Sequence, residues 1–171
     1  TIDGEGFYLA PTNPDVNHYL ISVIDELSKK YNIDGIHYDY IRFHNSRYGY
    51  NEIGLSEFNR KNIGNINANK EVLFSEFKRN SITNFVKKAS DKIKSNSNKI
   101  IISAAVKPNI YDAKLLFFQE WDLWLSAGYL DWAVPMNYMV KNDDFVQNMF
   151  MIKDNLPPKY HNKIVVGVST Y

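Results

Sequence analysis

The sequence predicts an α/β fold with parallel strands, specifically a partial (β/α)8 barrel of about five strands. Three observations support this prediction. Apolar segments of strand length alternate with segments of helical periodicity along the 171 residues. The expected strands are nearly continuous apolar runs, as in parallel strands that are covered on both faces. Polar side chains gather where these strands end, and the carboxyl ends of the strands form the active face of such a barrel.

The first 31 residues predict a short strand followed by a helix. Residues 7–11 read FYLAP, an apolar run closed by proline. Residues 12–31 have apolar side chains at helical spacing. Asn13 or Thr12 can cap this helix, and Pro14 suits its first position because proline lacks the N–H that goes unpaired there.

The rest of the chain continues the alternation. Residues 34–43, DGIHYDYIRF, predict a strand, and the Asn-, Gly- and Ser-rich residues 44–70 predict a long loop with little regular structure. A loop of that length inside a domain is usually functional or disordered. The remaining expected elements are a helix over 70–96, a strand over 99–108, a helix over 115–128, a strand over 130–139, a helix over 143–156 and a strand over 163–171.

The composition excludes several classes of function. The formal net charge is +1, which predicts neither nucleic acid nor an anionic membrane as a partner. The chain has no cysteine, so disulfides and cysteine-bound metals are excluded. No apolar run approaches the roughly 18 residues of a membrane span. His18, His44 and His161 lack ligand-like spacing with carboxylates, and no glycine-rich phosphate loop follows a strand, so we expect no metal site and no cofactor.

The strand at 34–43 carries the strongest candidate for catalysis. Since side chains alternate along a strand, Gly35, His37 and Asp39 share one face, and Asp39 lies at the rim. Arg42 follows and can either bind substrate or pair with Asp39. A carboxylate at the rim of a barrel suits glycoside hydrolysis, which uses one carboxyl group as the acid and a second as the base or nucleophile.

Other strand ends supply further candidates for the cleft. We expect His37 and Arg42 to contact substrate, together with Lys107, Asn137, Tyr138 and Tyr171. Trp121 and Trp124 lie three residues apart on an expected helix, which favours packing against the barrel over stacking on sugars. Asp131 begins its strand and is interpreted as structural. The second carboxylate is not evident, and the remaining candidates for it are Glu5, Glu52, Glu57 and Asp112.

Three segments resemble one known family. They are LAPTNPDVNHYLISVIDELSKKYNIDGIHYDYIRF at 9–43, WDLWLSAGYLDWAVPMNY at 121–138, and VVGVSTY at 165–171. Their motifs are similar to those of a bacterial glycosyl-hydrolase-like TIM-barrel family of secreted glycosidases and lipoproteins. The resemblance implies that residues 1–171 are a fragment of one barrel domain, from about the third strand to the seventh. It also implies an extracellular or cell-envelope location.

The resemblance extends to two groups of glycosidases. DGIHYD, residues 34–39, is similar to the D-G-x-R-x-D motif of the α-amylase clan, in which the last aspartate is the nucleophile. Asp39 takes that place and His37 replaces the arginine. The same stretch resembles the chitinase motif D-G-x-D-x-D-x-E, in which Ile41 falls on the catalytic glutamate. MNYM, residues 136–139, resembles the chitinase M-x-Y-D, with a methionine in place of the aspartate.

The function predicted from these features is hydrolysis of a polysaccharide or glycan, with Asp39 as nucleophile or base and a carbohydrate as the partner. An alternative is a non-catalytic carbohydrate-binding barrel that lacks a complete acid/base pair. A barrel enzyme acting on phosphorylated metabolites is the third class. Five strands of a barrel leave open edges, so we also expect self-association through them.

Overall fold

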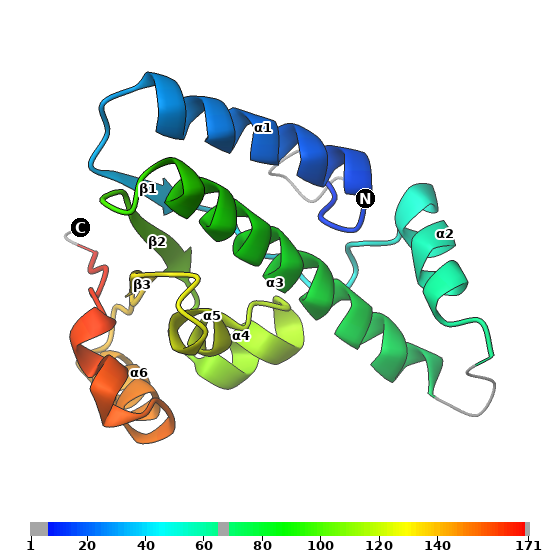
Figure 1. Ribbon diagram of the computed structural model, residues 1–171. Helices are drawn as coiled ribbons and strands as arrows, with labels where there is room; N and C mark the ends of the chain where they lie inside the picture. Colours follow the sequence, from blue (N-terminus) through cyan, green and yellow to red (C-terminus); the bar gives the residue numbers. More distant parts are fainter. Residues whose placement is uncertain (1–6, 65–68, 170–171) are drawn as a thin grey trace.

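In the part of the chain that the structure describes, three parallel strands form a sheet in the order β1-β2-β3 (Figure 1). The computed structural model describes residues 7–64 and 69–169. The strands are β1 (Gly35–Tyr38), β2 (Ile101–Val106) and β3 (Trp132–Pro135). His37 lies opposite Ser103, which lies opposite Trp132. The predicted α/β class with parallel strands is therefore confirmed, whereas the described residues contain three strands and not the expected five.

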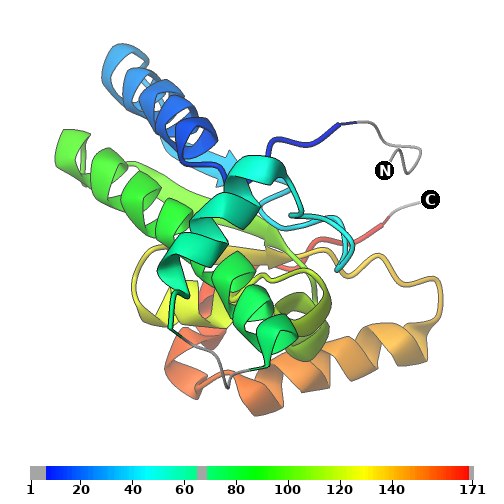
Figure 2. The same cartoon turned by 90° about the vertical axis from the view of Figure 1, so that its right-hand side faces the viewer.

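Six α-helices and one 3-10 helix accompany the sheet in the described part of the chain. In both views α1 lies beside α3, and α6 lies at the other end of the sheet from α1 (Figures 1 and 2). The helices are α1 (Pro14–Lys30), α2 (Glu52–Lys61), α3 (Lys70–Asn96), α4 (Ile110–Leu116), α5 (Trp121–Ser126), α6 (Asn142–Asn155) and the 3-10 helix Pro158–Lys163.

Asparagine caps the first four α-helices. The side chains of Asn13, Asn51, Asn69 and Asn109 accept hydrogen bonds from backbone N–H groups in the first turns of α1, α2, α3 and α4. Such caps satisfy N–H groups that have no partner inside the helix. Asn13 is thus the cap of α1, with Pro14 at the first helical position, as the sequence predicts. Thr12 instead accepts a hydrogen bond from Asn51 Nδ2 at 2.6 Å, which ties α2 to the start of α1.

The prediction of a loop with little regular structure over residues 44–70 is wrong for residues 52–61, because they form α2. The helix forms because Asn51 caps it and because Phe58 has a surface to pack on. The ring of Phe58 meets those of Phe74 and Phe77 on α3, with centroids 5.0 and 5.6 Å away. That burial depends on a helix distant in sequence, so local composition underestimates the order of this segment.

Two expected strands are reduced or missing. Residues 7–11 form no strand, and a hydrogen bond between the hydroxyl groups of Tyr8 and Tyr40 connects this segment to the end of β1 instead. Over the described part of 163–171, the chain makes two isolated parallel bridges beside β3, from Ile164 to Ala133 and from Gly167 to Met136. Among the described residues, β1 therefore has a strand neighbour on one side only.

The helix expected over 115–128 is interrupted. Only residues 115–116 and 121–126 of it are helical, as the end of α4 and as α5, and Phe118 between them takes the left-handed conformation with φ 56°. A phenylalanine rarely adopts a positive φ, so the surrounding packing must compensate for the strain. Phe118 is buried, and its ring meets Phe43 edge to face at 5.5 Å. Gln119, the residue after Phe118, lies within this interruption, and its side chain is fully buried in the core.

Buried side chains of the three strands, α3 and α5 make up most of the main core. Trp121 and Trp124 are both fully buried, which confirms that they pack rather than face a sugar. Their indole N–H groups donate to the backbone oxygen of Lys107 and to Thr83 Oγ1. Asp131 accepts a hydrogen bond from the backbone N–H of Ile102 at 2.8 Å, so its structural interpretation holds.

The buried amide of Gln119 joins two strand ends. Its Nε2 donates to the backbone oxygens of Ile41 and Ala105, both at 3.2 Å, and its Oε1 accepts from the backbone N–H of Lys107 at 2.9 Å. A backbone hydrogen bond from Phe43 to the oxygen of Phe117 supports the same connection. The segment that leaves β1 is therefore fixed to the end of β2.

Replacing this amide tests the connection. We expect Gln119→Met to lower the free energy of unfolding by about 2–4 kcal/mol, since two backbone oxygens and one N–H lose their partner inside the core. Chemical denaturation of both proteins measures the difference. Gln147→Met, at an exposed position of α6, is the control and should change stability by less than about 0.5 kcal/mol. Equal losses in the two variants would contradict the proposed role of Gln119.

Candidate active site at the end of strand β1

Asp39 lies immediately after β1, at the carboxyl end of the parallel sheet, and its side chain is exposed. Its Oδ1 accepts a hydrogen bond from the backbone N–H of Tyr40 at 2.6 Å. Tyr40 has φ 55°, a conformation uncommon for tyrosine that turns the chain sharply after the strand. The other carboxylate oxygen has no protein partner among the described residues. Asp39 is thus held in place by one oxygen and can meet a ligand with the other.

His37 lies on the exposed face of the sheet together with Gly35, as strand alternation predicts. Its Nδ1 is 2.9 Å from Ser103 Oγ on β2, directly across the ladder. Tyr38 points the other way and is buried, and burial raises the pKa of its phenol. The polar and apolar sides of this strand are therefore separated.

Arg42 does not pair with Asp39. Its guanidinium group lies over the ring of Tyr40, 3.9 Å from the ring centroid. Nε and Nη1 are enclosed and have no hydrogen-bond partner. Of the two predicted roles for Arg42, pairing with Asp39 is therefore wrong, since stacking on Tyr40 holds the side chain elsewhere. Contact with substrate stays a prediction.

The other predicted cleft residues differ in their exposure and in the contacts of their side chains. Lys107 follows β2, with its ammonium group 4.5 Å from the ring centroid of Phe117. Tyr138 follows β3 and is about half exposed. Asn137 is buried, where its amide donates to the backbone oxygen of Phe145 and accepts from Asn148 Nδ2. Asn137 therefore holds the connection between β3 and α6. Tyr171 lies outside the described residues.

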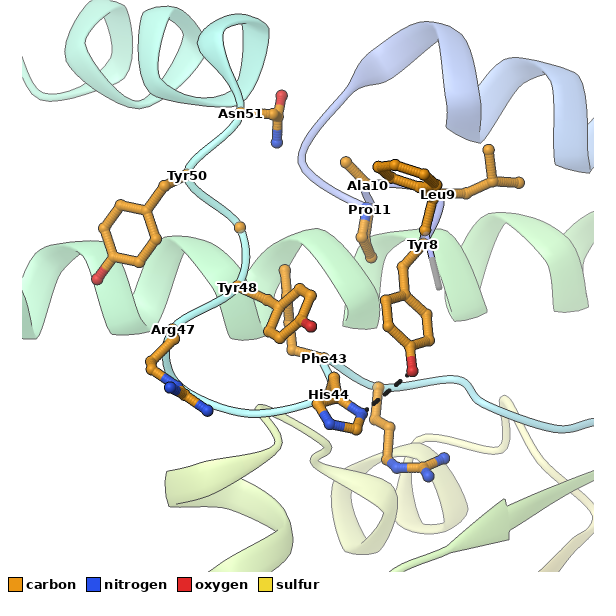
Figure 3. A pocket seen from close by; sticks show the side chains of 13 residues that line it. Tyr8, Leu9, Ala10, Pro11, Phe43, His44, Arg47, Tyr48, Tyr50 and Asn51 are labelled. Carbon is orange, nitrogen blue, oxygen red and sulfur yellow. Dashed lines mark hydrogen bonds between the residues drawn. The ribbon is translucent and has the colours of Figure 1, made fainter. Parts of the chain in front are cut away.

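An aromatic pocket that the sequence does not reveal lies beside these residues. Tyr8, His44 and Tyr48 line it, and Figure 3 shows their side chains facing one another from two separate stretches of chain. Its volume is about 290 Å³. The ring of Tyr8 stacks on Tyr40 and His44, with centroids 5.1 and 5.4 Å away, and meets Tyr48 edge to face at 5.5 Å.

Hydrogen bonds join three of these side chains. The Tyr8 and Tyr40 hydroxyls are 3.0 Å apart, and His44 Nδ1 lies 2.9 Å from the Tyr40 hydroxyl and 3.3 Å from that of Tyr8. The pocket was missed because Tyr8 and His44 are 36 residues apart. A usable signal was the density of tyrosine in residues 38–50, which exceeds what a buried strand and a short loop require.

A second pocket adjoins the first and contains Asp39. Its volume is about 470 Å³, and it shares Leu9, Pro11 and Arg42 with the aromatic pocket. Asp39 is the one acidic side chain among the described residues that line either pocket. Arg42 thus lines both pockets, and the two pockets together are called the cleft below.

Three of the four candidates for a second carboxylate do not line the cleft. Glu52 and Glu57 belong to α2, and Glu57 pairs with Arg60 at 2.8 Å. Asp112 lies in the first turn of α4. Glu5 is outside the described residues. The described residues of the cleft therefore include one acidic side chain, that of Asp39.

The loop that forms the aromatic pocket depends on Lys78 of α3. This lysine is only 2% exposed, and its Nζ donates to the backbone oxygens of Ser46 and Tyr48 at 3.0 and 3.3 Å. The ammonium group also lies 4.0 Å from the ring centroid of Phe118. Gly49 passes over the lysine with φ 99°, and a Cβ there would lie 2.9 Å from Lys78 Cδ. Burial lowers the pKa of Lys78 to about 8.

A scan of known protein families matches residues 1–168 to glycosyl hydrolase-like 10. The chain belongs to the glycosyl hydrolase-like 10 family. This match confirms the predicted resemblance and supports a glycosidase-like role. Among curated proteins, no sequence matches the chain. No helix in the described part of the chain is both long and apolar enough to cross a membrane.

We expect the buried lysine to make the stability of the folded protein depend on pH. The Lys78 ammonium has its pKa lowered from 10.5 to about 8 in the folded protein, so below about pH 8 folding carries a penalty for the buried charge. As pH rises from 8 to 10.5 the unfolded chain binds more protons, and that penalty disappears. Wild type should therefore gain about 2–3 kcal/mol of stability relative to Lys78→Met over this range.

Urea unfolding at pH 7 and pH 10 measures this relative change. Lys88→Met, at an exposed position of the same helix, corrects for other groups that titrate. A stability difference between wild type and Lys78→Met that stays constant with pH would show that the buried ammonium carries no such penalty.

Proposed function

We propose that this protein hydrolyses a glycosidic bond, with Asp39 as the nucleophile or base. The observation that carries the proposal is the position of Asp39. It is an exposed carboxylate at the carboxyl end of a parallel strand, and it is the one acid among the described residues that line its own pocket or the adjoining aromatic pocket. Membership of the glycosyl hydrolase-like 10 family supports the same class of reaction.

The surroundings of Asp39 suit this role. The hydrogen bond from the Tyr40 N–H orients the carboxylate, and the positive φ of Tyr40 bends the chain away from it. The remaining oxygen is then available to attack an anomeric carbon or to take a proton from water. His37 lies two residues back on the same side, where it can contact a sugar hydroxyl.

The reaction also needs a proton for the departing sugar oxygen. In retaining glycosidases the two carboxyl groups lie about 5–5.5 Å apart, and in inverting ones about 6.5–9.5 Å. Asp39 is the one acid among the described residues of the cleft. The proton must therefore come from a group that is not a carboxylic acid or from an acid outside the described residues. Asp39 is accordingly proposed as the nucleophile or base and not as the acid.

Removing the charge of Asp39 tests the proposal. We expect Asp39→Asn to lower hydrolysis of a responsive polysaccharide by about 100-fold or more. The melting temperature should stay near that of wild type, because the amide oxygen of asparagine can still accept from the Tyr40 N–H. Asp143→Asn on the exposed start of α6 is the control and should keep full activity. Turnover at the wild-type rate by Asp39→Asn would exclude Asp39 from the chemistry.

A second function is favoured because Asp39 is the one acid among the described residues that line the cleft. A barrel that binds carbohydrate without cleaving it needs aromatic faces and hydrogen-bonding groups, which the Tyr8, His44 and Tyr48 pocket provides. The two functions differ in a direct measurement. Binding of a polysaccharide by wild type and Asp39→Asn alike, with no release of reducing ends by either, would favour this second function.

A further inference from the structure

The aromatic pocket has the size and lining of a site for one sugar ring. Its volume of about 290 Å³ is at the small end for ligand pockets. Tyr8 and Tyr48 meet edge to face at 87°, so their rings form an aromatic corner of the pocket. The phenol oxygens and His44 bring hydrogen-bonding groups to the same space (Figure 3). These features suit a polar ring with apolar C–H faces.

The described lining of the pocket carries two cationic side chains, Arg42 and Arg47, and no acidic one. Arg42 is the informative member of the pair, because Nε and Nη1 are enclosed without a hydrogen-bond partner. A buried cationic group of this kind is costly unless an opposite charge compensates it. The ring of Tyr40 compensates it only in part.

The third nitrogen of Arg42, Nη2, is not among the enclosed atoms and forms no hydrogen bond with the described residues. The guanidinium charge is delocalised over all three nitrogens. An anion that reaches Nη2 from the pocket therefore neutralises the whole group, and a charge-assisted hydrogen bond of this kind is stronger than a neutral one.

We propose that the aromatic pocket binds an acidic sugar unit whose anionic group contacts Arg42. This inference rests on the proposed function and specifies its substrate class. Arg42 lines both the aromatic pocket and the pocket that contains Asp39. The acidic unit therefore occupies a position next to the bond that Asp39 attacks, and Arg42 selects glycans that carry a negative charge at that position.

Binding of matched small sugars tests this site without requiring hydrolysis. The probes are methyl glucuronide, methyl glucoside and methyl glucoside 6-sulfate, which differ only at C6, and NMR titration of the protein measures their affinities. For wild type, we expect at least one of the two acidic probes to bind about tenfold more tightly than methyl glucoside. The two acidic probes show whether the site takes a carboxylate or a sulfate.

Variants identify the group responsible. Arg42→Gln should abolish the preference for the acidic probe, whereas Arg47→Gln, which removes the same charge from the same pocket, should retain most of it. Arg42→Lys keeps the positive charge but lacks the planar guanidinium group, so it should show a reduced preference for the acidic probe. This variant supplies the test if Arg42→Gln does not fold. Equal binding of all three probes by wild type, or an unchanged preference in a folded Arg42→Gln, would overturn the proposal. Loss of hydrolysis in Asp39→Asn has no bearing on these affinities, so the two proposals fail separately.

Discussion

The hydrogen bonds of one buried amide, that of Gln119, determine where the candidate site lies. This side chain joins the backbone oxygen of Ile41, just after Asp39, to the last residues of β2. Without it, the backbone oxygen of Ile41 would lose this partner in a segment that lies beyond the end of β1 at Tyr38. The strained φ of Phe118 places Gln119 there, and its cost is offset by the packing of Phe118 on Phe43.

A second buried polar group, Lys78, acts on the other end of the same loop. Gln119 fixes the chain at residue 41, and Lys78 fixes it at residues 46 and 48. Between these points the loop carries Arg42 and His44 into the cleft. The aromatic pocket is therefore formed by a loop attached at both ends to the core, and Tyr8 completes it from the segment before α1. This arrangement keeps the pocket formed without help from a regular strand.

Several elements could be predicted because their signals are local. Asn13 before Pro14 marks the start of α1, and the apolar periodicity of residues 70–96 gives α3 with its observed bounds. The alternation that separates His37 from Tyr38 likewise follows from strand geometry. Helix α2 and the break between α4 and α5 could not be predicted in this way. Each depends on packing against residues far away in the chain, such as Phe58 on Phe74 and Phe118 on Phe43.

The sequence by itself determined the α/β class, the family and the position of Asp39 at the end of a strand, because periodicity and motif spacing are properties of neighbouring residues. Only the tertiary structure decided that Arg42 stacks on Tyr40 instead of pairing with Asp39. It also decided that Asn137 is buried in a structural role and that Tyr8 meets His44. The physical reason is that partners for a charge, an amide or a ring are chosen by proximity in space, which chain order does not record.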